Sequence, residues 1–228
     1  AYPTVDAPYG LKPVNLIGGL PFAGATRQIP IAANYATAIF NGDVVQYAAD
    51  GTVIITTMQN QVANAIVPGV IGVFLGCSYT DVNLGYTIFS QRYPGGVAAT
   101  DIVAYVCDDP NALYKVVGCV SAVADNAAGG LAPSFKARTN TVSKNAELVL
   151  NTGVAASGNS RMGIFVNNVT SALPMTVVDV VPDTANAAGS FLSSPSQRRR
   201  LCNRVRQCTR SMVRSLYTRN HCDGFLNY

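Results

Sequence analysis

The stretch Gly69-Val70-Ile71-Gly72-Val73-Phe74-Leu75-Gly76 decides the fold class, because it is almost continuously apolar. A short run of this kind fits a β-strand that is covered on both faces. The apolar region around it, residues 65–77, is interrupted by Pro68 and three glycines. It is also shorter than the roughly 18–20 residues of a membrane helix. The sequence therefore predicts a buried strand here and no membrane span.

Further strand-like segments lie on both sides of this run. Residues 43–48 and 52–57 flank Ala49-Asp50-Gly51, which predicts a hairpin with Gly51 at a position of positive φ. Short strands separated by turns, with few helix-like stretches, predict a mainly β fold, an antiparallel barrel or sandwich. The other predicted strands cover residues 69–76, 85–93, 101–107, 111–118, 161–167 and 174–181, with turns at 94–96 and 108–110.

The composition agrees with a single β-rich structural domain. Of the 228 residues, 49% are hydrophobic and 12% are charged. Such a chain can bury a large core and lacks the signature of disorder. Its low charge indicates that much of its surface is held against neighbouring subunits. Residues 27–192 are expected to form this core domain.

Residues 1–26 are predicted to form an extended arm. Prolines at positions 3, 8, 13 and 21 remove amide donors and argue against both a helix and a central strand. An arm this apolar should pack on its own core or on a neighbour, and we favour the neighbour. The side chains expected to make this subunit contact are Tyr2, Val5, Pro8, Tyr9, Leu11, Leu16 and Phe22.

Residues 193–228 differ from the rest of the chain in charge and pattern. The first 192 residues carry 8 Lys+Arg and 11 Asp+Glu (8 − 11 = −3), whereas the tail carries 8 Arg and one Asp (8 − 1 = +7). The tail is predicted to contain a basic helix, because apolar residues recur at helical spacing in it. These residues are Leu201, Val205, Cys208, Met212 and Leu216.

Three explanations of the tail remain open. Its arginines could bind nucleic acid through phosphates, or they could dock on an acidic partner or on the acidic body. The segment could also be the fortuitous product of a reading-frame shift, because it uses Arg alone whereas the body uses four Lys and four Arg. The arginines expected to face an acidic partner are Arg198, Arg199, Arg200, Arg204, Arg206, Arg210 and Arg214.

Residues suited to catalysis are scarce. His221 is the only histidine and Glu147 the only glutamate, so a Ser–His–Asp or Cys–His device would have to use the tail. Cys202, Cys208, His221 and Cys222 could donate to zinc, but their spacing does not fit the familiar knuckles. We therefore predict no enzyme activity, no metal site and no cofactor.

The remaining cysteines and the N-terminus indicate a cytosolic product. Cys77, Cys107 and Cys119 lie in or at the end of apolar runs and are predicted to be buried small hydrophobic residues. No basic region followed by an apolar run opens the chain, so no signal peptide is predicted. Ala1 is the type of residue that remains after an initiator Met is removed.

Six phrases between residue 5 and about residue 191 form a set. The first is Val5-Asp6-Ala7-Pro8-Tyr9-Gly10-Leu11-Lys12-Pro13-Val14, and the others are residues 29–31, 38–45, 70–73, 105–111 and 178–183. Together they resemble the head decoration (cement) proteins of tailed bacteriophages, including marine and cyanobacterial phages. After Phe191 the sequence departs from this family, in which a further alternating strand follows. The departure favours either a lineage-specific helix or the frame-shift explanation of the tail.

The resemblance implies a β-rich subunit on the outer face of a capsid, often dimeric or trimeric, that clamps adjacent copies of the major capsid protein. It implies a place on the virion after synthesis in the host cytoplasm, without a membrane partner. The alternative is a nucleic-acid-binding structural protein acting through residues 197–219, whose binding should weaken steeply with salt. Nucleic acid is the less favoured partner.

Overall fold

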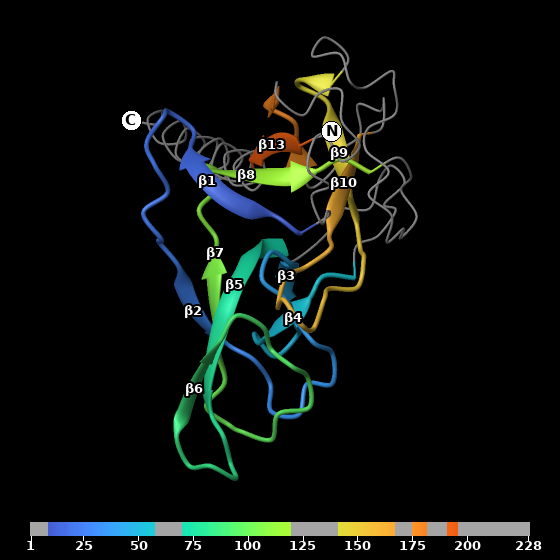
Figure 1. Cartoon of the computed structure of the whole chain (residues 1–228). Helices are drawn as coiled ribbons and strands as arrows, with labels where there is room; N and C mark the ends of the chain where they lie inside the picture. The colour runs from blue at the N-terminus through green and yellow to red at the C-terminus, as the bar shows by residue number, and fades with distance from the viewer. Residues whose placement is uncertain (1–8, 58–69, 120–140, 167–174, 182–190, 196–228) are drawn as a thin grey trace, which may run out of the picture. The chain divides into compact units, whose positions relative to one another are not determined.

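The computed structural model describes residues 9–57, 70–119, 141–166, 175–181 and 191–195 (Figure 1). The chain divides into two compact units, residues 1–196 and residues 197–228, and the described residues all belong to the first. The predicted basic helix and its seven candidate arginines therefore lie outside the described residues.

The described residues form three antiparallel sheets and almost no helix, which confirms the predicted mainly β fold. None of the three sheets closes into a barrel. The largest has the order β2-β7-β5-β3-β4, and β6 pairs with β5 beside this path. Its strands are β2 (Arg27–Pro30), β3 (Val44–Tyr47), β4 (Val53–Ile55), β5 (Val70–Thr80), β6 (Thr87–Ser90) and β7 (Val103–Cys107).

Two smaller sheets complete the described part of the fold (Figure 1). The four-stranded sheet has the order β1-β8-β13-β12, and the three-stranded sheet has the order β10-β9-β11. The first contains β1 (Lys12–Leu16), β8 (Ala112–Val117), β12 (Asp179–Val180) and β13 (Phe191–Pro195). The second contains β9 (Asn145–Val149), β10 (Gly163–Val166) and β11 (Met175–Thr176).

The central strand β5 contributes to two separate apolar clusters. Its pairing with β3 skips Ile71 and its pairing with β7 skips Leu75, so the strand carries two bulges. A bulge changes the face to which the following side chains point. Consequently Ile71, Phe74 and Cys77 pack in one cluster, whereas Val73 packs in the other. The prediction of a strand covered on both faces is confirmed.

The two clusters draw on different strands. The first combines buried side chains of β8, β9 and β10 with Leu11, Val44 and Val73. The second covers one face of the six-stranded sheet and includes Ile39, Tyr93 and Ile102 from its connecting loops. The long loops of the six-stranded sheet therefore supply part of its core.

Turn chemistry is predicted correctly from the sequence. Gly51 has a φ of 82° in the β3–β4 hairpin, and Gly95 and Gly96 have φ values of 86° and 66° in the turn before β7. Asp109 closes the turn before β8, because its carboxylate accepts from the amide of Asn111 at 2.8 Å.

Three predictions about strands are wrong. Residues 174–181 do not form one strand, since β11 joins the three-stranded sheet and β12 joins the four-stranded sheet. Strand β9 was not expected, although it lies at the centre of its sheet. The sheet structure also continues past residue 192, because β13 extends to Pro195 and pairs with β8.

The cysteine prediction is confirmed: Cys77, Cys107 and Cys119 are buried. Burial raises the pKa of the Cys77 thiol to about 12, which keeps it protonated. Within the described parts of the chain, no helix has the length and hydrophobicity needed to cross a membrane.

Candidate subunit-contact site

The N-terminal segment packs on the core of its own subunit from Leu11 onward. The amide of Leu11 donates to the carbonyl of Gly42 at 2.9 Å, and its side chain is fully buried. Strand β1 then pairs with β8 at the edge of the four-stranded sheet, a position that tolerates Pro13. The chain is therefore not a free arm over this stretch.

The seven side chains predicted for subunit contact fall into three groups. Leu11 is inaccessible to a neighbour, which removes it from the set. Leu16 and Phe22 are partly buried against the first cluster, and Tyr9 is half-buried. Tyr2, Val5 and Pro8 lie outside the described residues.

A group of polar side chains fixes this segment to two distant loops; we call Lys12, Asn41, Asp43, Asn159 and Ser160 the polar junction. The ammonium of Lys12 donates to Oδ1 of Asn41 and, at 3.0 Å, to Oδ1 of Asn159. The backbone of Asn41 donates to Gly158 and accepts from Ser160, both at 3.0 Å. Three segments far apart in the sequence are thereby joined at one point.

The charges of the polar junction are perturbed by burial. Asp43 is 1% exposed, and burial raises the pKa of its carboxyl to about 6, although hydrogen bonds from Ser160 and Phe40 and the charge of Lys12 oppose the rise. Burial also lowers the pKa of Lys12, and the nearby Asp43 opposes this change. Since Asp43 and Ser160 are both inaccessible, the arrangement suits a structural link better than chemistry on a substrate.

Gly10 permits the close approach at this junction. Its φ is +77°, and a Cβ at this position would lie 2.6 Å from Cβ of Ser160 and 2.8 Å from the carbonyl oxygen of Gly42. Only a residue without a side chain fits both the conformation and the space. No local pattern in the sequence marks Gly10, because its close neighbours Gly42 and Ser160 lie about 30 and 150 residues away.

An exposed apolar surface begins directly after the junction; we call residues 14–22 the N-terminal turn. Its backbone is held by hydrogen bonds from Leu16 to Leu20 at 2.7 Å and from Ile17 to Asn111 at 2.8 Å. Nevertheless Val14, Ile17 and Leu20 are 48%, 50% and 65% exposed. A fixed backbone therefore presents three apolar side chains to solvent.

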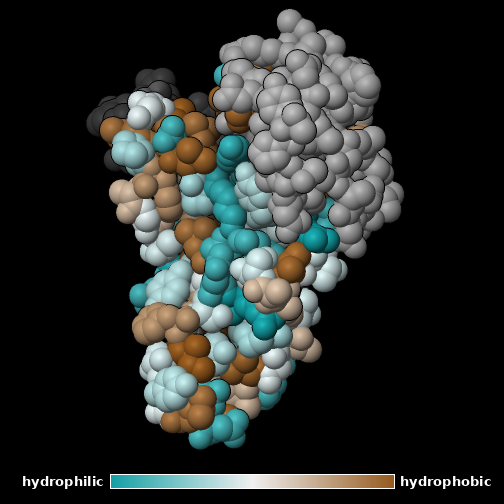
Figure 2. All heavy atoms as spheres, viewed as in Figure 1, coloured by the Kyte–Doolittle hydropathy of each residue, from teal (hydrophilic) through white to brown (hydrophobic). Residues whose placement is uncertain are grey.

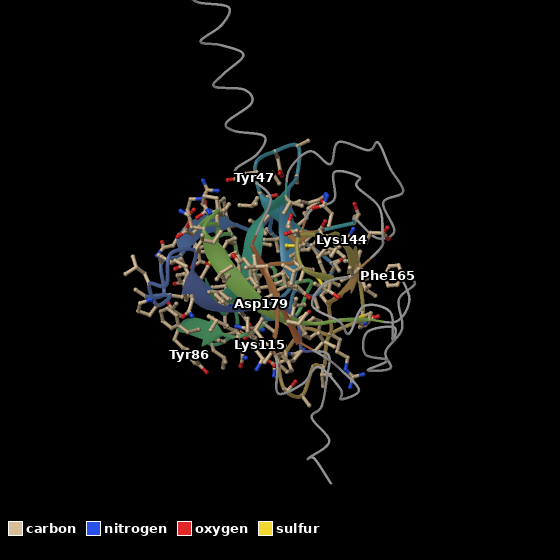
Figure 3. The ribbon with its side chains drawn as sticks, turned by 90° about the horizontal axis from the view of Figure 1, so that it is seen from above. Tyr47, Tyr86, Lys115, Lys144, Phe165 and Asp179 are labelled. Atoms are coloured by element: carbon tan, nitrogen blue, oxygen red, sulfur yellow. The ribbon has the colours of Figure 1, made fainter. Side chains whose placement is uncertain are left out.

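A second exposed apolar surface lies at the end of the hairpin formed by β5 and β6; we call residues 81–89 the β5–β6 tip. Val82, Leu84, Tyr86 and Phe89 are exposed by 65%, 59%, 57% and 75%. Figure 2 shows apolar atoms at the surface at the lower end of the view, where Figure 1 places this hairpin. Tyr86 lies at the margin of the molecule in Figure 3.

The β5–β6 tip was missed in the sequence because a tight turn is normally polar. The stretch Asp81-Val82-Asn83-Leu84-Gly85-Tyr86 contains the Asp, Asn and Gly of a turn, but every second residue is large and apolar. That combination is the signal that could have identified the surface.

In the described portion of the chain, no cluster of three or more His, Cys, Asp or Glu side chains could hold a metal ion. The potential zinc donors of the tail, including His221, lie outside the described residues.

No protein-family model, no curated protein and no solved structure matches this chain. Its function must therefore be inferred from its own residues.

Proposed function

We propose that this chain is a capsid decoration protein, a viral structural subunit that binds the outer face of an assembled shell of major capsid protein and stabilises it. The observation that carries the proposal is the N-terminal turn. There, Val14, Ile17 and Leu20 are exposed on a hydrogen-bonded backbone, directly after the phrase that resembles decoration proteins. Apolar side chains that the subunit does not bury itself are suited to burial against a neighbour.

The positions of the resembling phrases support the proposal. The phrases at residues 5–14 and 38–45 lie 30 residues apart in sequence but meet at the polar junction, through Leu11 and Gly42 and through Lys12 and Asn41. The packing of β8 against β9 and β10 across the first cluster further supports a sandwich-like body.

Stabilisation of a shell by such a subunit follows from mass action. A subunit that binds only the assembled shell stabilises it by RT ln(1 + [L]/Kd) for each site. Weak contacts repeated over a symmetric array reinforce one another through effective concentration. A backbone already fixed in its bound form loses little entropy on binding.

The test is binding of purified variant subunits to heads that lack the decoration protein. In the double variant Ile17→Ser, Leu20→Ser, we expect affinity to fall by about tenfold per residue, because each loses about 1.4 kcal/mol or more of apolar burial. The matched control is Val178→Ser, since Val178 is 38% exposed and lies outside both exposed surfaces. Subunit occupancy is measured by cryo-electron microscopy and by gel densitometry.

Deletion of residues 1–8 is a complementary variant. It removes Tyr2, Val5 and Pro8 but keeps Leu11 of the first cluster and Lys12 of the polar junction. We expect occupancy to fall if these residues also contact the shell. Unchanged occupancy in both the deletion and the Ile17→Ser, Leu20→Ser variant, or no binding of the wild-type chain to any head, would overturn the proposed function.

A further inference from the structure

The edge strands of the described sheets differ in how they are protected against pairing. Free strand edges in native proteins commonly carry Lys, Arg or Pro, which block the addition of another strand. The edge strand β1 contains Lys12 and Pro13, and the edge strand β2 contains Arg27 and Pro30. Two of the sheet edges are thus blocked by their own side chains.

Strand β6 has none of these features. The edge strands β4 and β10 also lack them, but of these three strands only β6 carries a large apolar side chain that is strongly exposed. Its sequence is Thr87-Ile88-Phe89-Ser90, without a charge or a proline, and of the described strands only β5 pairs with it. Phe89 points to the same face as its partner Ser78, away from the cluster that contains Cys77, and is 75% exposed. Among the described residues, no strand therefore covers the outer edge of β6, and Phe89 is exposed beside that edge.

Local hydrogen bonds hold the loop that leads into β6. The carboxylate of Asp81 accepts from the amides of Asn83 at 2.8 Å and Leu84 at 3.1 Å. The amide of Gly85, with a φ of +69°, donates to the carbonyl of Asp81 at 2.8 Å. Because the loop is already ordered, its exposed apolar side chains can be buried at little entropic cost.

We infer that β6 and the β5–β6 tip bind a second copy of this chain, with the two β6 strands antiparallel across a two-fold axis. An antiparallel edge is complementary to itself under such a rotation, so one patch can serve both copies. Residues paired across an antiparallel ladder share a face of the sheet. A two-fold pairing therefore places Phe89 opposite its own equivalent or opposite Thr87 of the second copy, with the aromatic ring on the shared outer face.

The exposed area fits a weak dimer. Two aromatic and two aliphatic side chains, each more than half exposed, offer about 400 Å² in each copy. Two copies together would bury at most about 800 Å² of side chain, which is below the roughly 1,000 Å² of a stable specific interface, so the backbone hydrogen bonds between the two strand edges must supply part of the affinity. We therefore expect a dimer that dissociates in the micromolar range in solution.

Dimer formation through β6 requires no capsid. The dimer can therefore be disproved while the proposed decoration function holds, and the decoration function can be disproved while the dimer holds. The test uses the full chain in the absence of heads, by sedimentation velocity over a wide concentration range. We expect a concentration-dependent dimer for the wild type. The variant Phe89→Lys, which places a blocking charge on an exposed position, should raise the dimer Kd by at least about 30-fold. The matched control Val178→Lys should dimerise as the wild type does.

Hydrogen exchange separates strand pairing from other self-association. As the concentration rises, the amides of residues 87–90 should gain protection in the wild type but not in Phe89→Lys. The inference is overturned by a wild-type chain that stays monomeric at several hundred micromolar. It is equally overturned by a dimer that Phe89→Lys leaves intact, or by a dimer whose formation does not protect β6, including one built on a different surface.

Discussion

The ammonium of Lys12 donates to the side-chain carbonyl of Asn159 at 3.0 Å, across 147 residues of sequence. This bond, with the one from Lys12 to Asn41, holds the start of the four-stranded sheet against a loop that precedes β10. The N-terminal turn is therefore positioned by the polar junction. The hydrogen bond from the amide of Ile17 to the carbonyl of Asn111 and the pairing of β1 with β8 hold the same turn from its other side.

The first prediction concerns the strength of this link. Lys12→Met keeps much of the side-chain volume but removes its charge-assisted hydrogen bonds, and it should lower the free energy of unfolding by about 1–3 kcal/mol. Asn159→Ala should act through the same bond, so the double variant should be less destabilised than the sum of the single variants. Urea unfolding of all four proteins gives a double-mutant cycle, and a coupling energy below about 0.5 kcal/mol would contradict the link.

The second prediction is a pH dependence that originates in Asp43. Burial raises the pKa of its carboxyl from the ordinary 3.8 to about 6 in the folded chain, so the folded state favours the protonated carboxyl. The contribution is fully present below about pH 4 and is lost as the pH rises through 6, with a total of about 3 kcal/mol. Asp43→Asn cannot ionise, and its amide oxygen can still accept from the amide of Phe40.

The measurement compares the free energies of unfolding of wild type and Asp43→Asn between pH 4 and pH 7. The difference between the two proteins should change in favour of Asp43→Asn as the pH rises, and it should level off above about pH 7. Groups common to both proteins cancel in the difference. Parallel stability curves over this range would show that Asp43 does not titrate as described.

The contact between Lys12 and Asn159 also shows how far the sequence could predict the structure. The apolar run at residues 69–76 and the turn at Ala49-Asp50-Gly51 are local signals, and both correspond to described elements. The pairing of Lys12 with Asn159 depends on how three segments meet, and no local pattern encodes it. The same reason explains the error at residues 174–181, where Met175 pairs with Ala146 in one sheet and Asp179 pairs with Ser193 in another.

Strand β9 was missed for a different reason. The segment at residues 145–149 carries the only glutamate of the chain, and Glu147 is nonetheless 4% exposed. A buried carboxyl side chain in a central strand opposes the usual pattern of hydrophobic alternation. Leu11 shows the converse, because its apolar character predicted contact with a partner, whereas its own subunit buries it.

The third prediction tests the close packing at Gly10. Gly10→Ala must accommodate a Cβ at 2.6 Å from Ser160 and a positive φ, so it should lower the free energy of unfolding by more than about 2 kcal/mol. Gly19→Ala is the matched control, because its φ is +84° and no atom lies within 4 Å of the added Cβ. The control should lower the free energy of unfolding by only about 1 kcal/mol, which is the cost of the backbone conformation.

Thermal unfolding measures the difference between these two glycine variants. For a chain of this size, 1 kcal/mol corresponds to about 2–4 °C in Tm. Gly10→Ala should therefore unfold at a clearly lower temperature than Gly19→Ala. Equal Tm values would mean that the space around Gly10 is not restricted.

The last prediction separates the decoration function from its nucleic-acid alternative. The proposed contact surfaces lie within residues 1–196, the first of the two compact units. A chain that ends after Ser196 lacks all eight arginines of the tail. We expect it to bind heads with the occupancy of the full chain and to retain the same dimer Kd.

Two results together would contradict this prediction. The truncated chain would no longer bind heads, and the full chain would bind duplex DNA with an affinity that falls steeply as the salt concentration rises. A log–log slope of several units would then count the phosphates contacted by the tail, and nucleic acid would replace the capsid as the principal partner.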